Sequence, residues 1–353
     1  MTGIYIHVPF CRRKCNYCGF FSESGKENLM EAYAGKIIKE AKKYSGECAD
    51  TVYFGGGTPS LLGDELLTKI LCGIKDIFNI EKNSEITLEA NPKTVDRASL
   101  CRLREAGFNR ISFGFQSFCD SELALLGRIH SAKDNEIAVK WAREAGFDNI
   151  SGDIISAVPG QKMENIEYSV DKMLSLGLSH ISAYSLIVEE GTPFYNMRDE
   201  LALPDEDTER KMYWYIADRL EKAGYEHYEI SNFAKDGKRS RHNTKYWTNE
   251  PYIGLGAGAH SYYGGFRYSN VCNTEKYIAK DYTEDERTAV CGRDAEEEKY
   301  MLGLRMKEGV LYTPNEKADK YIKLGYLKRH GDNICLTKKG IDVADYIIAD
   351  IIA

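Results

Sequence analysis

Two nearly identical hexapeptides, about 40 residues apart, constrain the fold more than any other feature of this chain. Residues 104–109 read Arg-Glu-Ala-Gly-Phe-Asn, and residues 143–148 read Arg-Glu-Ala-Gly-Phe-Asp. Each copy is followed by an apolar run, at 111–115 and at 150–155. Because a glycine commonly ends a helix before the next strand begins, the repeat marks one helix–strand unit. A series of such units predicts a parallel sheet covered by helices.

Similar units extend over the first two-thirds of the chain. Apolar runs at 4–9, 51–54 and 85–89 alternate with amphipathic stretches at 28–44 and 66–78. Weaker copies of the repeat at Gly177 and Gly224 bring the expected number of strands to about six by residue 185. That number is too small for a closed eight-unit barrel. We therefore predict an α/β fold with a partial (β/α)6 barrel over 1–235, followed by further α/β additions.

The rest of the chain has a different pattern. Residues 236–290 are rich in Gly and Tyr without a clear period, and we expect a connecting segment there. Residues 291–353 predict a helix, a second helix over 318–324, short strands at 325–327 and 333–336, and a last helix over 338–351. This order is typical of a winged-helix-like module. Since 54 acidic residues outnumber 47 basic ones, we expect a packing or partner module and no nucleic-acid binding.

Composition bounds the class of protein. The apolar runs are shorter than the roughly 18 residues that span a bilayer, and the start of the chain lacks a basic secretory region. We expect a cytoplasmic protein without a transmembrane segment, for which peripheral membrane contact and a homodimer stay open. Ten cysteines do not indicate a disulfide scaffold in such a chain. Seven of them are isolated, at positions 48, 72, 101, 119, 272, 291 and 335.

The other three cysteines follow the first predicted strand with the spacing C-x3-C-x2-C, as Cys11, Cys15 and Cys18. Zinc prefers four ligands, so a zinc site would need His7 or a distant residue as well. A [4Fe–4S] cluster on three cysteines would leave one iron open to another ligand. The basic residues 12–14 would offset the charge of such a cluster and lower the thiol pKa values. The spacing favours a cluster, with zinc and unrelated cysteines as the alternatives.

Polar residues follow or end several of the next strands. Gly55–Pro59 reads Gly-Gly-Gly-Thr-Pro, and Glu89, Gln116 and Asp153 stand at or near strand ends, with Arg128 between two of them. Chemistry in βα barrels gathers at the carboxyl ends of the strands. Asp153 lies in an apolar strand, where an unpartnered carboxylate is costly. Each residue alone also fits a tight turn or a solvated strand end.

Together, the cysteine spacing and these strand ends resemble the radical S-adenosylmethionine superfamily. The resemblance implies that the open iron binds the amino and carboxylate groups of S-adenosylmethionine, which reduction cleaves to a 5′-deoxyadenosyl radical. Within the superfamily, the chain resembles the oxygen-independent coproporphyrinogen III oxidase group. The residues that match that group's contacts to S-adenosylmethionine are Tyr5, Tyr17, Gly56, Gly57, Thr58, Glu89, Gln116, Arg128, Asp153 and Ile187.

Three further segments resemble the HemW branch of that group: residues 228–234, the His-Asn-x-x-Tyr-Trp motif at 242–247, and residues 254–261. The branch is implied to bind heme and to pass it to apo-proteins such as respiratory enzymes. The decarboxylases carry a fourth cysteine where this chain has Phe20. The branch usually has an acidic residue where this chain has Gly19. The implied cofactors are a [4Fe–4S] cluster, S-adenosylmethionine and heme.

The residues themselves make a weaker argument for heme. His242 can ligate heme iron, and Tyr246 and Trp247 can stack on a porphyrin. His260 is a second candidate ligand, whereas His7 is expected to orient the cysteine loop. Basic side chains that could meet heme propionates are Lys235, Lys238, Arg239, Arg241 and Lys245. A solvated basic loop leading to a core aromatic pair explains the same residues.

Rival functions follow from the same features. An anaerobic coproporphyrinogen III dehydrogenase would remove propionate carboxyl groups as carbon dioxide, although Phe20 argues against it. A radical enzyme for another substrate and a structural zinc protein are the other two alternatives.

Overall fold

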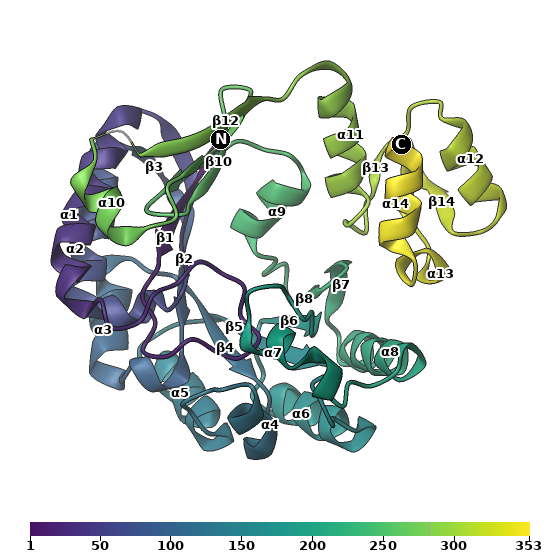
Figure 1. The fold of residues 1–353 in the computed structure, drawn as a ribbon, viewed down its shortest axis with the longest axis horizontal. Coiled ribbons are helices and arrows are strands. Elements are labelled where there is room, and N and C mark those ends of the chain that lie inside the picture. The colour runs from purple at the N-terminus through teal and green to yellow at the C-terminus, as the bar shows by residue number, and fades with distance from the viewer. Residues whose placement is uncertain (282) are drawn as a thin grey trace.

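The chain forms a curved sheet with helices on its outer side and a small C-terminal unit beside it, in a computed structural model that describes residues 1–281 and 283–353 (Figure 1). In the described part of the chain, the main sheet has 12 strands in the order β12-β11-β10-β9-β1-β2-β3-β4-β5-β6-β8-β7. The strands of this sheet are β1 (Thr2–Val8), β2 (Cys48–Gly56), β3 (Asn79–Ala90), β4 (Arg110–Gln116), β5 (Asn149–Ser156), β6 (His180–Ser185), β7 (Glu226–Glu229), β8 (Asn232–Ala234), β9 (Tyr252–Leu255), β10 (His260–Tyr263), β11 (Phe266–Asn270) and β12 (Glu284–Ala289).

Strands β1 to β6 are parallel neighbours in chain order, which confirms the predicted partial barrel. Among the described residues, β1 pairs with β2 and β9 while β6 pairs with β5 and β8, so these six strands do not close on themselves. The helices that accompany the sheet are α1 (Met30–Ala41), α2 (Gly63–Ile77), α3 (Arg97–Ala106), α4 (Asp120–Leu125), α5 (Ala132–Glu144), α6 (Met163–Ser175), α7 (Pro193–Asn196), α8 (Glu206–Lys222), α9 (Arg241–Trp247) and α10 (Thr274–Ala279).

The repeat seen in the sequence ends two of these helices. Helix α3 begins with a capping box between Asp96 and Ser99, and Gly107 follows its end with φ +115°. Helix α5 is followed in the same way by Gly146, with φ +89°. A left-handed residue closes a helix at little cost only when it is glycine. The two hexapeptides are therefore helix ends, and they are followed directly by β4 and β5.

The hydrophobic core lies between the sheet and the outer helices. Strand β1 is almost wholly buried, and its Ile4 and Ile6 pack in one cluster with Ile37 of α1 and Ile70 of α2. Parallel strands covered on both faces read as nearly continuous apolar runs, which explains the pattern of the sequence.

Residues 236–290 extend the sheet beyond β1. Strand β9 is parallel to β1, and β10, β11 and β12 follow as antiparallel neighbours. These strands are four to six residues long, so the sequence offers little periodicity to detect. Helix α9 lies inside the curve of the sheet, between its β1 and β7 sides (Figure 1).

The C-terminal unit has its own small core and an antiparallel sheet in the order β13-β15-β14. Its elements are α11 (Gly292–Gly303), β13 (Val310–Leu311), α12 (Glu316–Lys323), β14 (Leu327–His330), β15 (Asn333–Leu336), α13 (Lys338–Ile341) and α14 (Ala344–Ile352). Helices around a hairpin agree with the predicted winged-helix-like arrangement. The predicted last helix over 338–351 is two helices, because the chain breaks at Asp342. The Asp342 carboxylate there accepts a hydrogen bond from Trp214 Nε1 at 2.7 Å.

Across the described residues, the longest apolar helical stretches fall short of what a membrane crossing requires.

Candidate functional site

One cavity of about 1320 Å³ opens at the carboxyl ends of the barrel strands. Its wall includes the cysteine loop, the ends of β2 to β6, helix α9 and residues of the C-terminal unit. A pocket for a single small ligand usually measures roughly 300–1,000 Å³. This cavity therefore has room for more than one ligand.

The three clustered cysteines all line this cavity. Two of the thiols contact residues of the barrel. Arg128 Nη1 donates to Cys15 Sγ at 3.4 Å, and Cys11 Sγ lies 3.6 Å from Thr58 Oγ1. Burial raises the pKa of Cys18, and the neighbouring thiols raise it further. Three thiolates in one place would repel one another unless a cationic centre were bound between them.

The arrangement fits an iron–sulfur cluster better than one zinc ion. Within the described residues, no set of three or more His, Cys, Asp or Glu side chains is placed to hold a single metal ion. A four-iron cluster keeps its thiolate ligands farther apart than one ion does. His7, the local candidate for a fourth zinc ligand, instead donates from Nε2 to the Phe21 carbonyl at 2.9 Å and accepts from Tyr5 at Nδ1. His7 thus orients the cysteine loop, as expected.

The glycine-rich loop after β2 lies directly against the cysteine loop. A Cβ atom at Gly57 would lie 2.8 Å from the Phe10 carbonyl oxygen and 3.0 Å from Cys11 Sγ. Only glycine allows this approach, so the loop and the cysteines form one continuous wall. Gly56, Gly57 and Thr58 all face the cavity.

Glu89 lies in the cavity wall at the end of β3. Its Oε1 accepts a hydrogen bond from the Tyr53 hydroxyl at 2.6 Å. Burial raises the pKa of Glu89 to about 7; Asp153 raises it as well, whereas the hydrogen bond from Tyr53 and the charge of Arg110 lower it. An ionised Glu89 can accept two hydroxyl groups of a ribose.

The raised pKa predicts how binding of S-adenosylmethionine depends on pH. If the ionised Glu89 accepts the ribose hydroxyls, protonation below pH 7 removes an acceptor. Affinity should then fall about tenfold between pH 8 and pH 6. Isothermal titration with S-adenosylmethionine at both pH values measures this change. Glu89→Gln should bind weakly at both values, whereas an unchanged tenfold step in the variant would assign the titration to another group.

Asp153 and Arg110 are two further charged residues whose fields act on Glu89. Burial raises the pKa of Asp153 to about 6, while hydrogen bonds from serines and the charge of Arg110 lower it. Arg110 is 1% exposed, and its Nε and Nη1 atoms have no hydrogen-bond partner among residues 1–281 and 283–353. Both residues line the cavity. Arg110 therefore supplies the positive charge that keeps two carboxyl groups tolerable in the barrel interior.

Gln116 ends β4 with φ +69°, a backbone conformation that is costly for a residue other than glycine. Arg128 lies nearby and donates from Nη2 to the Gly114 carbonyl at 2.7 Å. The structure brings all ten residues matched to S-adenosylmethionine contacts to the same cavity: Tyr5, Tyr17, Gly56, Gly57, Thr58, Glu89, Gln116, Arg128, Asp153 and Ile187.

Gly19 leaves space for an acidic side chain from elsewhere. A Cβ atom at Gly19 would lie 1.8 Å from Glu189 Oε2 and 2.9 Å from Glu189 Cδ. Glu189 follows β6 and also lines the cavity. The carboxylate beside the cysteine loop thus comes from Glu189, in the place that a side chain at position 19 would take.

This contact predicts a compensating pair of substitutions. Gly19→Asp should force Glu189 aside and set two like charges together, lowering the free energy of unfolding by about 1 kcal/mol. Adding Glu189→Ala should restore most of that loss, since the new carboxylate then has the space to itself. Denaturant unfolding of the two single variants and the double variant measures the coupling. Purely additive effects would show that the two positions do not compete.

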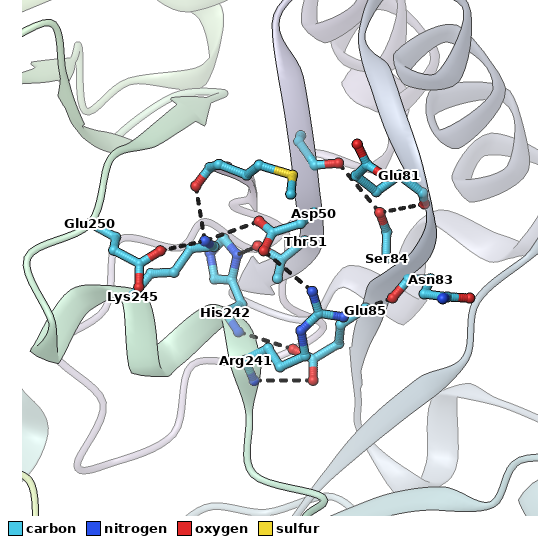
Figure 2. Close-up of polar contacts among 12 residues, drawn as sticks. Asp50, Thr51, Glu81, Asn83, Ser84, Glu85, Arg241, His242, Lys245 and Glu250 are labelled. Carbon is cyan, nitrogen blue, oxygen red and sulfur yellow. Dashed lines mark hydrogen bonds and ion pairs between the residues drawn. The ribbon is translucent and has the colours of Figure 1, made fainter. Parts of the chain in front are cut away.

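The predicted heme motif forms helix α9, which is anchored to the barrel. The Glu85 carboxylate of β3 accepts the backbone N–H groups of Arg241 and His242 at 3.1 and 3.0 Å (Figure 2). His242 is 1% exposed, with Nδ1 2.8 Å from Thr51 Oγ1 and Nε2 2.9 Å from the Tyr246 hydroxyl. Both ring nitrogens are thus engaged inside the protein. Burial lowers the pKa of His242 to about 3, so the ring is neutral.

Tyr246 and Trp247 line the cavity, whereas His242 lies behind them against Tyr5 and Tyr53. The basic residues expected to meet propionates point elsewhere. Lys245 is 4% exposed and pairs with Asp50 and Glu250, as Figure 2 shows. The remaining partners in this group are Asp148 for Lys238, Glu226 and Glu308 for Arg239, Asp50 for Arg241 and the Tyr225 ring for Lys235. None of these five cations lines the cavity, so that expectation is wrong.

Several cavity residues were not predicted from the sequence, and three of them carry charge close to the barrel interior or the heme motif. Arg110 is the first residue of β4, and a charge at the start of an apolar run could have indicated a polar barrel interior. Glu229 lies in the Tyr-Glu-Ile-Ser-Asn-Phe-Ala segment, and Arg305 follows α11, a helix rich in charged residues. No local sequence pattern indicates that Glu229 and Arg305 line the same cavity, because they come from parts of the chain that are far apart in sequence.

Comparison with known proteins agrees with this geometry. Residues 5–173 match the Radical SAM superfamily. The chain is 40% identical to the heme chaperone HemW of Lactococcus lactis, over 94% of this chain and 88% of that protein. It is 40% identical to HemW of Bacillus subtilis, over 91% and 87%, and 31% identical to HemW of Escherichia coli, over 96% and 94%.

Among solved structures, the coproporphyrinogen III oxidase HemN of Escherichia coli has a similar fold. The TM-score is 0.83 at 19% sequence identity, over 99% of this chain and 89% of that chain. At this identity the likeness concerns the fold alone, and it includes the C-terminal unit.

Proposed function

The chain belongs to the HemW family within the radical SAM superfamily, and from this premise we propose that it binds heme and transfers it to apo-proteins. One observation carries the proposal. A single large cavity joins the cysteine loop to Tyr246 and Trp247 of the heme motif. The radical scaffold and the tetrapyrrole would therefore share one chamber.

At the barrel end of the chamber, we assign the [4Fe–4S] cluster to Cys11, Cys15 and Cys18. S-adenosylmethionine would lie beside it against the Gly56–Thr58 loop, Glu89 and Arg128. The forked guanidinium of Arg128 suits the methionyl carboxylate, since it faces the same loop. When bound, the two cofactors supply one-electron chemistry at this end of the chamber.

At the other end, Tyr246 and Trp247 offer aromatic surfaces for a porphyrin plane. His242 supports this surface from behind, because its Nε2 holds the Tyr246 hydroxyl at 2.9 Å. We assign His242 a positioning role in the ligand-free protein. Ligation of iron by His242 would first require the hydrogen bonds to Thr51 and Tyr246 to break.

The recipients in this proposal are apo forms of heme proteins, with respiratory enzymes as the first candidates, and the transfer takes place in the cytoplasm. The exposed apolar residues Phe20 and Tyr346 lie on the cavity wall and would meet a recipient or the heme edge. Such patches on a protein surface commonly mark binding sites.

A dehydrogenase of coproporphyrinogen III is the second candidate, favoured by the HemN-like fold over nearly the whole chain. The test is anaerobic incubation of reconstituted protein with S-adenosylmethionine, a low-potential reductant and coproporphyrinogen III, followed by chromatography of porphyrins. We expect no protoporphyrinogen from protein with an intact cluster. Many turnovers to that product would overturn the chaperone proposal and make the chain an enzyme of heme synthesis.

A further inference from the structure

The guanidinium of Arg305 stands in the cavity wall and, in the part of the chain that the structure describes, has no bonded anion. Its Cζ lies 4.7 Å from the centre of the Trp247 ring. Within the described residues, no carboxylate lies within 4.0 Å of its nitrogens, and its buried Nε has no hydrogen-bond partner. Nε1 of Trp247 is also buried and unpartnered. Arg305 and Trp247 both line the cavity, so this stacked pair belongs to its wall.

Arg305 is held in this place by the backbone, which joins the C-terminal unit to the barrel. Its carbonyl accepts the N–H group of Ile230 at 3.2 Å, and the Lys307 N–H donates to the Tyr228 carbonyl at 2.9 Å. Met306, between them, forms a bridge with Glu229. A cation on such a frame is positioned before any ligand arrives, which lowers the entropy lost on binding.

Glu229 and Asp342 are acidic residues of the same cavity wall, and among the described residues neither forms an ion pair with Arg305. Glu229 accepts from the Ser231 N–H at 3.0 Å and from the Asn232 amide, while its Oε2 stays unpartnered. Burial raises the pKa of Glu229, which favours its neutral form. Asp342 is engaged with Trp214 at 2.7 Å and with Arg210 at 3.7 Å. The positive charge of Arg305 therefore remains available to a ligand.

We propose that Arg305 and Trp247 form a carboxylate subsite that takes a propionate of the bound tetrapyrrole. This inference rests on the proposed heme function. It adds the residues that would bind the propionate carboxylate of the heme. The guanidinium fork would donate two N–H hydrogen bonds to the carboxylate, while the Trp247 ring packs against the face of the guanidinium. Arg128, at the far end of the same cavity, serves the cysteine loop and is not part of this subsite.

The test compares heme with heme dimethyl ester, in which both carboxylates are esterified. Wild-type protein should bind heme about tenfold or more tightly than the ester, and Arg305→Met should lose that preference while binding the ester as before. Arg329→Met is the matched control, because Arg329 also stacks on an aromatic ring in the C-terminal unit but does not line the cavity. Absorbance titration measures all affinities, and thermal unfolding checks that each variant folds.

Glu229→Gln provides a second variant, in which the buried carboxyl group near Arg305 becomes a neutral amide. We expect it to keep the wild-type preference for heme over the ester, and loss of that preference would show that Arg305 alone does not form the subsite. An unchanged preference for heme over the ester in Arg305→Met would overturn the subsite while leaving heme binding intact. Failure of wild type to bind either form would instead overturn the heme function, and this inference with it.

Discussion

Replacing Cys18 with alanine is expected to abolish the iron–sulfur cluster. The three thiols of Cys11, Cys15 and Cys18 line one cavity, and no fourth cysteine is near them among the described residues. A [4Fe–4S] cluster on three cysteines already has one iron without a protein ligand. With only two thiolates, a second iron would lose its protein ligand, and the cluster would no longer be held. Anaerobic reconstitution of the variant should leave almost none of the brown visible absorbance, against about four irons per wild-type chain.

Cys72→Ala is the control for this experiment. Cys72 is an exposed cysteine on α2, far in the fold from the cavity wall. This variant should reconstitute like wild type. A full cluster in Cys18→Ala would show that another side chain serves as ligand, and it would overturn the assignment.

Replacing His242 with alanine is expected to destabilise the protein by about 3 kcal/mol or more. The change removes a fully buried ring that stacks on Tyr5 and Tyr53, which leaves a cavity. It also leaves the buried hydroxyl groups of Thr51 and Tyr246 without their hydrogen-bond partner, the His242 ring. Denaturant unfolding measures the loss, with His330→Ala as the control at an exposed position, expected within about 0.5 kcal/mol of wild type.

The same position also bears on heme. His242→Gln can keep hydrogen bonds to both neighbouring hydroxyls and should retain most of the stability. If His242 only positions Tyr246, this variant should bind heme with an unchanged Soret band. Loss of an axial-ligand signature in a stable His242→Gln protein would contradict the positioning role and make His242 a heme ligand.

Much of the fold could be predicted from the sequence, because its signals are local. The two Arg-Glu-Ala-Gly-Phe segments are helix ends, and a helix end followed by an apolar run needs no distant partner to be recognised. The cysteine spacing is equally local, since all three ligands lie on one loop. The residues assigned to S-adenosylmethionine stand at strand ends, and the topology of a parallel sheet brings those ends together.

The parts that could not be predicted depend on contacts between distant segments. Strands β9 to β12 join the sheet although their sequence shows no period, because β9 pairs with β1 and each later strand pairs with the one before it. The sequence predicts that the five basic residues around 235–245 are available to a ligand. In the structure they instead form ion pairs with acidic residues or, for Lys235, lie over a tyrosine ring. Arg305 reaches the cavity only through the docking of the C-terminal unit on β7 and β8.

The central claim is that this chain carries heme and hands it on, and heme transfer tests it most directly. Protein loaded with one heme and freed of excess would be mixed with an apo respiratory heme protein, while the Soret band of the recipient is followed. The account predicts a transfer rate that rises with recipient concentration and exceeds the spontaneous loss of heme to a neutral scavenger. A rate independent of the recipient and equal to that loss would contradict the account.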